Sequence, residues 1–111
     1  MLNYNGKSYV CSLDLGFEII RGKWKVVILC HLSDGPKRFS ELQRVTCGVS
    51  QKMLSQSLKQ LEADDIIIKH VYPEIPPRVE YSLTKKGQEL VPALKTIEAW
   101  SKHYYSDILG F

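Results

Sequence analysis

The chain has 111 residues, of which 44% are hydrophobic and 24% are charged, and its formal net charge is only +3 at pH 7. This length fits a single domain with a packed core, and no apolar run approaches the roughly 18 residues typical of a membrane-spanning helix. The start of the chain, MLNYNGKSYVCS, lacks the charged and apolar segments of a secretory signal, so we expect a cytoplasmic protein with no membrane partner.

The first predicted helix lies near the N-terminus, with Ser12 as its expected N-cap. Asp14 falls in the first turn, where a carboxylate stabilises the helix dipole, and Gly22 ends the element. The next predicted helix runs from Lys23 to Leu32. It is apolar nearly all round, which is typical of a buried central helix.

Two further helices are predicted after a turn at positions 34–36. One runs from Phe39 to Val45 and the other from Gln51 to Ala63. Between them, Gly48 can adopt the left-handed conformation that a tight turn needs, and Ser50 is a good N-cap. Two helices joined by a short glycine-containing turn are typical of a helix-turn-helix.

A hairpin and a long helix complete the predicted elements. Residues 66–72 form the first expected strand, prolines interrupt residues 73–77, and residues 78–83 alternate in polarity as the returning strand. Thr84 is expected to cap a last helix that reaches Leu109. At about 1.5 Å per residue this helix would span about 37 Å. One small core cannot bury an apolar stripe of that length, so we expect the helix to pack against a second copy of the chain.

The order of these elements predicts the fold class α+β, mostly helical: a winged helix-turn-helix with N-terminal and long C-terminal dimerisation helices. We expect one domain over residues 1–111. Within it, the first two helices occupy residues 11–36, the helix-turn-helix 38–63, the wing 66–84 and the C-terminal dimerisation helix 85–109.

Positive charge is concentrated in the middle of the sequence. From Lys37 to Lys59 there are five basic residues and one acidic residue, whereas from Gly87 to Phe111 there are two basic and three acidic residues. This distribution is typical of a nucleic-acid-binding face. On charge alone, an ordinary solvated helix surface is an equally good interpretation.

The predicted fourth helix divides into an apolar and a polar face. The inward stripe is expected to be Met53, Leu54, Leu58 and Leu61, and the outward face Gln51, Lys52, Ser55, Gln56, Lys59 and Gln60. No acid precedes Glu62 in this helix, and Gln, Ser and Lys side chains can donate to bases or phosphates. We therefore predict double-stranded DNA as the partner, contacted by Lys37, Arg38, Ser50, Gln51, Lys52, Ser55, Gln56, Lys59 and Arg78.

Two of these predicted contacts have structural alternatives. Arg38 precedes the third predicted helix, where it can hold either the DNA backbone or the protein fold. Arg78 in the wing can reach a minor groove or a phosphate, or it can pair with the nearby Glu74 or Glu80.

No pattern in the sequence points to catalysis or to a cofactor. Cys11, Cys30 and Cys47 are too far apart for a CxxC pair, no Cys/His cluster suggests a zinc site, and the odd number of cysteines favours free thiols. The histidines are scattered, and neither a Gly-rich phosphate loop nor a nucleophile motif appears. We therefore expect a protein that is not an enzyme, with no catalytic residues, no metal and no cofactor.

Several short motifs follow one another between Cys11 and Trp100. They are Cys11, Gly22-Lys23-Trp24, Arg38-Phe39-Ser40-Glu41-Leu42, Gly48-Val49-Ser50, Leu54 with Leu58 and Leu61-Glu62, the run from Arg78 to Thr84, and Gly87. Each motif is weak alone. Taken together, in this order and at these spacings, they resemble the HxlR-type winged helix-turn-helix regulators, relatives of the MarR group.

The resemblance implies a homodimeric transcription factor of bacterial or archaeal type. It implies that the first and last helices form the dimer and that the helix from Gln51 to Ala63 enters the major groove. Several relatives sense electrophiles or oxidants through a cysteine placed like Cys11, which makes Cys11 a redox-sensing candidate. In the family that cysteine is usually followed by proline, whereas here Ser12 follows it.

We therefore expect a homodimer on a (pseudo)palindromic operator, with an oxidant or a small molecule as inducer. The start of a helix favours the reactive thiolate form of Cys11. The alternative is that Cys11 is only a small apolar residue that packs under the dimer helices. Cys30 is expected to be shielded and Cys47 partly exposed. The alternative function is a winged-helix protein–protein interaction module without sequence-specific DNA binding.

Overall fold

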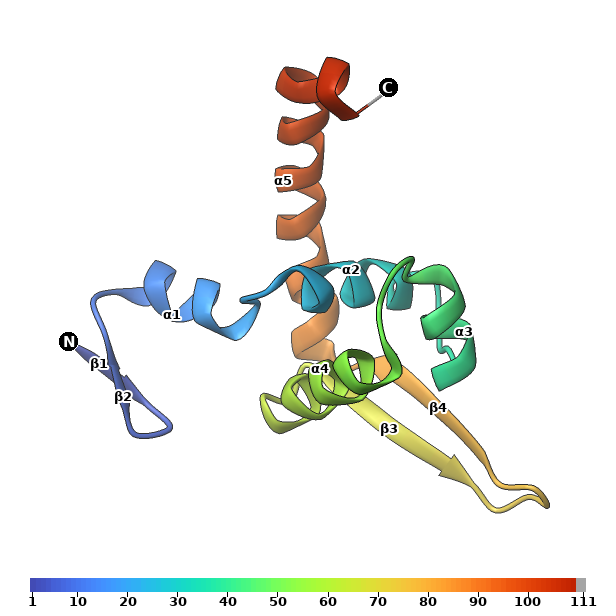
Figure 1. Cartoon of the computed structure of the whole chain (residues 1–111). Helices are drawn as coiled ribbons and strands as arrows, with labels where there is room; N and C mark the ends of the chain where they lie inside the picture. The colour runs from blue at the N-terminus through green and yellow to red at the C-terminus, as the bar shows by residue number, and fades with distance from the viewer. Residues whose placement is uncertain (110–111) are drawn as a thin grey trace.

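The computed structural model describes residues 1–109, which form helices and two small antiparallel hairpins (Figure 1). In chain order the elements are β1 (Leu2–Tyr4), β2 (Lys7–Tyr9), α1 (Ser12–Ile19), α2 (Lys23–Leu32), α3 (Phe39–Val45), α4 (Gln51–Ala63), β3 (Ile67–Tyr72), β4 (Arg78–Leu83) and α5 (Lys85–Leu109). The predicted winged helix-turn-helix of mostly helical α+β class is confirmed.

An N-terminal hairpin, which the sequence prediction missed, precedes the helices. Its turn consists of Asn5 and Gly6, with φ values of 50° and 77°. Both lie in the left-handed region, as in the type I′ turn for which Asn-Gly is the strongest sequence signal. Tyr9 is buried, and Tyr4 Oη donates a 2.8 Å hydrogen bond to Asp64 Oδ1. The hairpin is therefore fastened to the end of α4.

Helix α1 has Cys11 as its N-cap, so the prediction of Ser12 in that role is wrong. Cys11 has extended backbone angles (φ −160°, ψ 177°), and its carbonyl accepts a 3.1 Å hydrogen bond from Leu15 N–H. The Asp14 carboxylate accepts a 2.9 Å hydrogen bond from Val10 N–H, which orders the chain before Cys11 and leaves Ser12 inside the helix. No residue of α1 is buried.

The hydrophobic core lies between α2, α3, α4 and the wing. Its completely buried apolar side chains on the helices are Ile28, Leu29, Leu42, Leu54, Leu58 and Leu61. Ile66 and Ile67 close this core from the side of the wing. Within α2 and α4 the buried residues recur at spacings typical of one helix face.

Helix α2 is not buried on all sides, contrary to the prediction. Ile28 and Leu29 are completely buried, but Val27 is 37% exposed and Cys30 is half-buried. In Figure 1 α1 extends away from the body, and Val27 and Cys30 line an open groove between α1, α2 and α5. An apolar pattern indicates which faces avoid water, but not what covers them.

Thr46, just after α3, is completely buried, and its hydroxyl has no hydrogen-bond partner among the described residues. Burying an unpaired hydroxyl costs about 1–3 kcal/mol. The Thr46→Val variant, which keeps the shape of the side chain, is therefore expected to raise the free energy of unfolding by about 1 kcal/mol. Urea denaturation at a fixed protein concentration measures this change.

The matched control for Thr46→Val is Thr84→Val. Thr84 Oγ1 accepts a 3.1 Å hydrogen bond from Gly87 N–H and donates one of 2.7 Å to the Asp65 carbonyl. Removing this hydroxyl is expected to lower the free energy of unfolding by about 1 kcal/mol. A Thr46→Val protein that is less stable than the parent would contradict the prediction.

The helix-turn-helix and the wing are held together locally. Gly48 in the turn has a φ of 89°, and Ser50 Oγ accepts a 3.1 Å hydrogen bond from Met53 N–H as the N-cap of α4. Lys37 and Tyr81 exchange two backbone hydrogen bonds of 3.0 and 2.8 Å. The segment before α3 is thus tied to β4, which fixes the orientation of the wing relative to the helix-turn-helix.

Helix α5 contributes Leu94 to the core, and its C-terminal half extends away from it (Figure 1). Gly87 in its first turn lies against the Ile66 carbonyl, where a Cβ atom would overlap the carbonyl oxygen. Farther along, the helix contains Pro92 and departs from helical angles at Tyr105 (φ −126°). Within residues 1–109, none of the helices has the length and hydropathy needed to cross a membrane.

Candidate nucleic-acid interface

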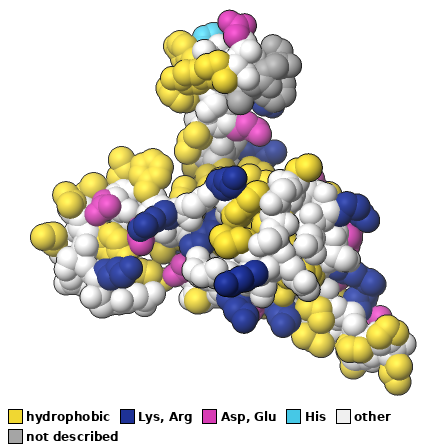
Figure 2. Space-filling model, in the orientation of Figure 1, with side chains coloured by type: hydrophobic (Ala, Val, Ile, Leu, Met, Phe, Trp, Pro, Cys, Tyr) yellow, Lys and Arg dark blue, Asp and Glu magenta, His cyan; other side chains and the backbone are white. Residues whose placement is uncertain are grey.

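The outer face of α4 is polar, basic and open to solvent. The leucines of this helix are buried, whereas Lys52, Gln56 and Lys59 on the opposite face are exposed. Figure 2 shows Lys and Arg side chains gathered over this part of the molecule. Helix α4 lies at the edge of the fold (Figure 1), and its exposed side chains are free of cover by residues 1–109, so they can approach a groove about 12 Å wide.

The N-terminal end of α4 adds a favourable dipole to these side chains. Its first turn contains no acidic residue, and the first N–H groups of a helix have no intrahelical acceptor. Such an end attracts phosphate. Ser50 already serves as the N-cap here, so its contact with DNA stays a prediction.

The predicted division of α4 into two faces is wrong at one position. Met53 is 40% exposed, whereas Ser57 is 6% exposed and takes the inner position one turn later. Met53 lies at the edge of the apolar stripe and lines a small pocket together with Arg21 and Trp24. Of the residues predicted to face outward, Ser55 is half-buried. The others are exposed: Gln51, Lys52, Gln56, Lys59 and Gln60.

The two basic residues before α3 differ in their surroundings. Lys37 is half-buried, and its backbone pairs with Tyr81 of the wing. Arg38 is exposed, and its backbone N–H donates a 3.1 Å hydrogen bond to Glu41 Oε1. The backbone of Arg38 thus serves the fold by helping to begin α3, while its side chain lies on the surface.

Arg78 is engaged within the wing, as in the alternative interpretation of its sequence position. Its guanidinium lies 3.5 Å from a Glu74 oxygen and 3.9 Å from a Glu80 oxygen. It also lies over the Tyr72 ring, 3.8 Å from the centroid. Contact with DNA would require these carboxylates to share the guanidinium with a phosphate.

The three cysteines are free thiols in different environments. Cys11 and Cys47 are exposed, and Cys30 is half-buried. Burial, with a smaller contribution from Glu98, raises the pKa of the Cys30 thiol. The raised pKa disfavours the reactive thiolate form of Cys30, but the thiol is half-buried rather than fully shielded as expected.

Lys25, to which the sequence prediction assigned no role, is only 8% exposed. Its ammonium group donates a 3.3 Å hydrogen bond to the Ile19 carbonyl. The available signal was a lysine beside the apolar run of residues 26–30 in α2. Because the N-terminal hairpin was not predicted, the surroundings of Lys25 could not be inferred.

Sequence comparison places the chain among helix-turn-helix regulators. The model of the HxlR-like helix-turn-helix family matches residues 19–108. An uncharacterized HTH-type transcriptional regulator of Methanothermobacter thermautotrophicus is 46% identical over 98 residues, which cover 88% of this chain and 75% of that protein. The HTH-type transcriptional regulator YtcD of Bacillus subtilis is 45% identical over 104 residues, covering 94% of this chain and 82% of YtcD.

Structural comparison leads to the same group. The structure of the redox regulator HypR in its oxidized form matches with a TM-score of 0.79 and 40% identity, covering 84% of this chain and 96% of the HypR chain. The family match covers most of the sequence, and the winged helix-turn-helix presents a basic helix to solvent. The chain therefore belongs to the HxlR-like helix-turn-helix family and is a DNA-binding transcriptional regulator rather than an enzyme.

Proposed function

We propose that the chain regulates transcription as a homodimer that binds a (pseudo)palindromic operator with α4 in the major groove. The observation that carries this proposal is the exposed face of α4, where Gln56 lies between Lys52 and Lys59. A glutamine can read adenine through two hydrogen bonds, and lysines hold phosphates or guanine. The residues proposed to contact DNA are Lys37, Arg38, Ser50, Gln51, Lys52, Ser55, Gln56, Lys59 and Arg78.

The proposed unit is a single domain over residues 1–111. Its segments are the first two helices (11–36), the helix-turn-helix (38–63), the wing (66–84) and the C-terminal dimerisation helix (85–109). The core shared by α2, α3, α4 and the wing supports a single domain.

The exposed apolar side chains of α1 and α5 support a homodimer. Phe17 on α1 is 55% exposed, and on α5 Trp100 is 55% and Tyr104 66% exposed. A groove of about 700 Å³ lies between α1, α2 and α5, with Val27 and Ile97 in its lining. A second copy related by a two-fold axis would cover these surfaces and set two α4 helices about 34–36 Å apart, one turn of DNA.

Substitutions on α4 test the DNA contacts. Lys52→Ala or Lys59→Ala is expected to weaken operator binding and to lower the slope of log affinity against log salt by about 1. Gln51→Ala or Gln56→Ala is instead expected to reduce sequence preference. The difference in binding free energy between the operator and random DNA should fall by about 1–3 kcal/mol. Fluorescence anisotropy with an operator selected from a random DNA pool, at several salt concentrations, measures both effects.

The matched control is Lys95→Ala, which removes the same charge from an exposed position on α5. It is expected to leave the salt slope unchanged. If the four α4 variants bind specific and random DNA as the parent does, α4 is not the recognition helix. If the parent itself shows no preference for any selected DNA, the chain acts as an interaction module instead.

A second proposal concerns Cys11 as the sensor of an oxidant or electrophile. Cys11 is exposed at the start of α1, and α1 is one of the two proposed dimer helices. HypR, which is 40% identical to this chain, is described as a redox regulator. A modified Cys11 would shift α1 against the partner and thereby change the spacing of the two α4 helices.

A further inference from the structure

A small pocket, here called the α2–α4 pocket, lies on the flank of α4 beside the start of α2. Its volume is about 140 Å³, which is below the roughly 300–1,000 Å³ typical of small-molecule sites but leaves room for one phosphate group. Its α2 side consists of Arg21, Gly22, Trp24 and Lys25, and its α4 side of Met53, Gln56, Ser57 and Gln60. Because Gln56 belongs to the proposed DNA-binding face, the pocket continues that face onto α2.

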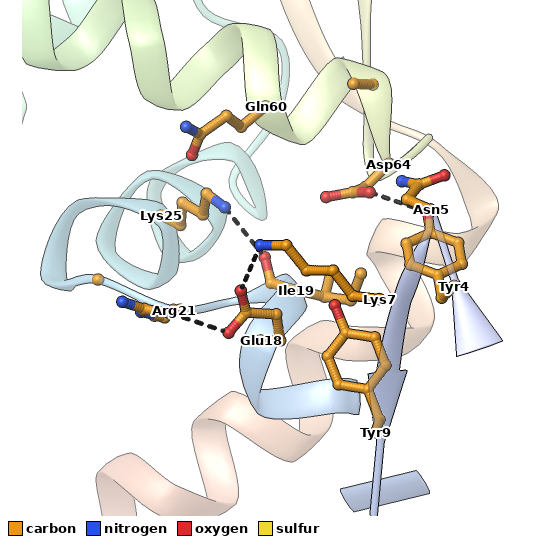
Figure 3. Close-up of a pocket in the computed structure, with 12 residues that line it drawn as sticks. Tyr4, Asn5, Lys7, Tyr9, Glu18, Ile19, Arg21, Lys25, Gln60 and Asp64 are labelled. Carbon is orange, nitrogen blue, oxygen red and sulfur yellow. Dashed lines mark hydrogen bonds and ion pairs between the residues drawn. The ribbon is translucent and has the colours of Figure 1, made fainter. Parts of the chain in front are cut away.

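The lining of the α2–α4 pocket is positively charged. It contains the cations Arg21 and Lys25 and no Asp or Glu side chain. The side chain of Arg21 is 76% exposed, and it pairs over 3.2 Å with Glu18, which lies outside the lining (Figure 3). Glu18 also has Lys7 Nζ at 3.9 Å. Two cations thus share one carboxylate, so Arg21 keeps charge with which to attract an anion.

Lys25 adds a buried positive charge to the same lining. Its side chain is 8% exposed, and its ammonium group donates a 3.3 Å hydrogen bond to the Ile19 carbonyl (Figure 3). No carboxylate among residues 1–109 forms an ion pair with it, although buried lysines are almost always paired. Salt screens a buried charge less than an exposed one, so Lys25 strengthens the attraction for an anion in the pocket.

Neutral donors surround these cations. Gln56 and Gln60 are exposed, and their amides can donate to phosphate oxygens. The N-cap Gly22 offers no side chain to the first turn of α2, which contains no acidic residue, so its N–H groups add further donors. At the edge of the pocket, Lys23 Nζ lies 4.6 Å from the centroid of the Trp24 ring. The pocket therefore combines charge and hydrogen-bond donors without a competing acid.

We propose that the α2–α4 pocket binds a backbone phosphate of the DNA, on the strand that passes the α2 side of α4. This inference rests on the function proposed above, in which α4 lies in the major groove. The phosphates of both strands line the edges of that groove, so one strand passes beside Gln56 and Gln60. Arg21 holds the phosphate and Lys25 attracts it, which fixes how α4 sits in the groove. A phosphate contact carries no sequence information, so it strengthens binding to all DNA.

The first test uses the full chain in fluorescence anisotropy titrations with operator and random DNA at several salt concentrations. Arg21→Gln is expected to weaken both DNAs about 10-fold, as for the loss of a charged hydrogen bond, and to lower the salt slope by about 1. Arg21→Lys, which keeps the charge, is expected to keep the slope of the parent. Lys25→Met, which removes the buried charge, is expected to weaken both DNAs as well.

The matched control is Lys7→Gln. It removes a cation that pairs with the same Glu18 but lies outside the α2–α4 pocket, and it is expected to leave affinity and slope unchanged. An Arg21→Gln protein with the affinity and slope of the parent would overturn the proposal, as would an equal loss in Lys7→Gln. Because random DNA is included, the pocket is tested even if the parent shows no preference for an operator, a result that would contradict only the proposed function.

The second test locates the phosphate. An operator is synthesised with a neutral methylphosphonate at one backbone position at a time. At one position in each half-site the parent is expected to lose about 10-fold in affinity, whereas Arg21→Gln loses nothing further there, because the two changes remove the same contact. If every methylphosphonate weakens Arg21→Gln as much as it weakens the parent, Arg21 does not hold a phosphate and the proposal is wrong.

Discussion

An Ile97→Glu protein is expected to be a monomer and to bind the operator about 10²- to 10⁴-fold more weakly than the parent, because the second half-site is no longer bound intramolecularly. Ile97 is 47% exposed on α5 and lines the groove between α1, α2 and α5. In the proposed dimer a carboxylate at this position would be buried without a partner, which strongly disfavours association. In the monomer it remains in water, so the fold is expected to survive.

Sedimentation at micromolar concentration and operator titration measure the two effects of Ile97→Glu together. The matched control is Thr96→Glu, which adds the same charge one residue earlier, at an exposed position outside the groove lining. This variant is expected to remain a dimer. A parent protein that sediments as a monomer would contradict the homodimer, and a dimeric Ile97→Glu protein would show that this groove is not the interface.

Treatment of the parent with diamide is expected to reduce operator affinity toward the nonspecific level, about 10³-fold or more below specific binding. The reason is geometric: two recognition helices must match half-sites about 34–36 Å apart. Diamide takes two hydrogens from two thiols and would join Cys11 to a thiol of the second subunit in a disulfide. This bond at the start of α1 would alter that spacing through the dimer. Cys11→Ser is expected to bind the operator normally and to keep its affinity after treatment.

Cys30→Ser and Cys47→Ser are the controls for the thiol experiment. Because burial raises the pKa of the Cys30 thiol, its replacement is expected to leave the response to diamide intact. Cys47 is exposed in the turn before α4, so its variant distinguishes a direct effect beside the recognition helix from an effect through α1. If Cys11→Ser loses affinity on treatment as the parent does, Cys11 is not the sensor.

The starts of α4 and α5 were predictable because local chemistry decides them. Ser50 and Thr84 cap α4 and α5 with their own hydroxyls, and Gly48 takes the positive φ that the turn requires. The N-terminal hairpin was missed because each strand has three residues, too few to establish an alternating pattern. Its turn signal, Asn5-Gly6, was nevertheless present in the sequence.

The sequence by itself determined which residues of α4 carry the polar face, because 3.6 residues per turn place Lys52, Gln56 and Lys59 opposite the leucines. Only the tertiary structure decided the environments of Arg78 and Lys25. Arg78 is held by two glutamates and a tyrosine ring across the wing, and Lys25 is 8% exposed and donates a hydrogen bond to the Ile19 carbonyl at the end of α1. Burial and pairing depend on which distant segments pack together, and this packing cannot be predicted from the local periodicity of the sequence.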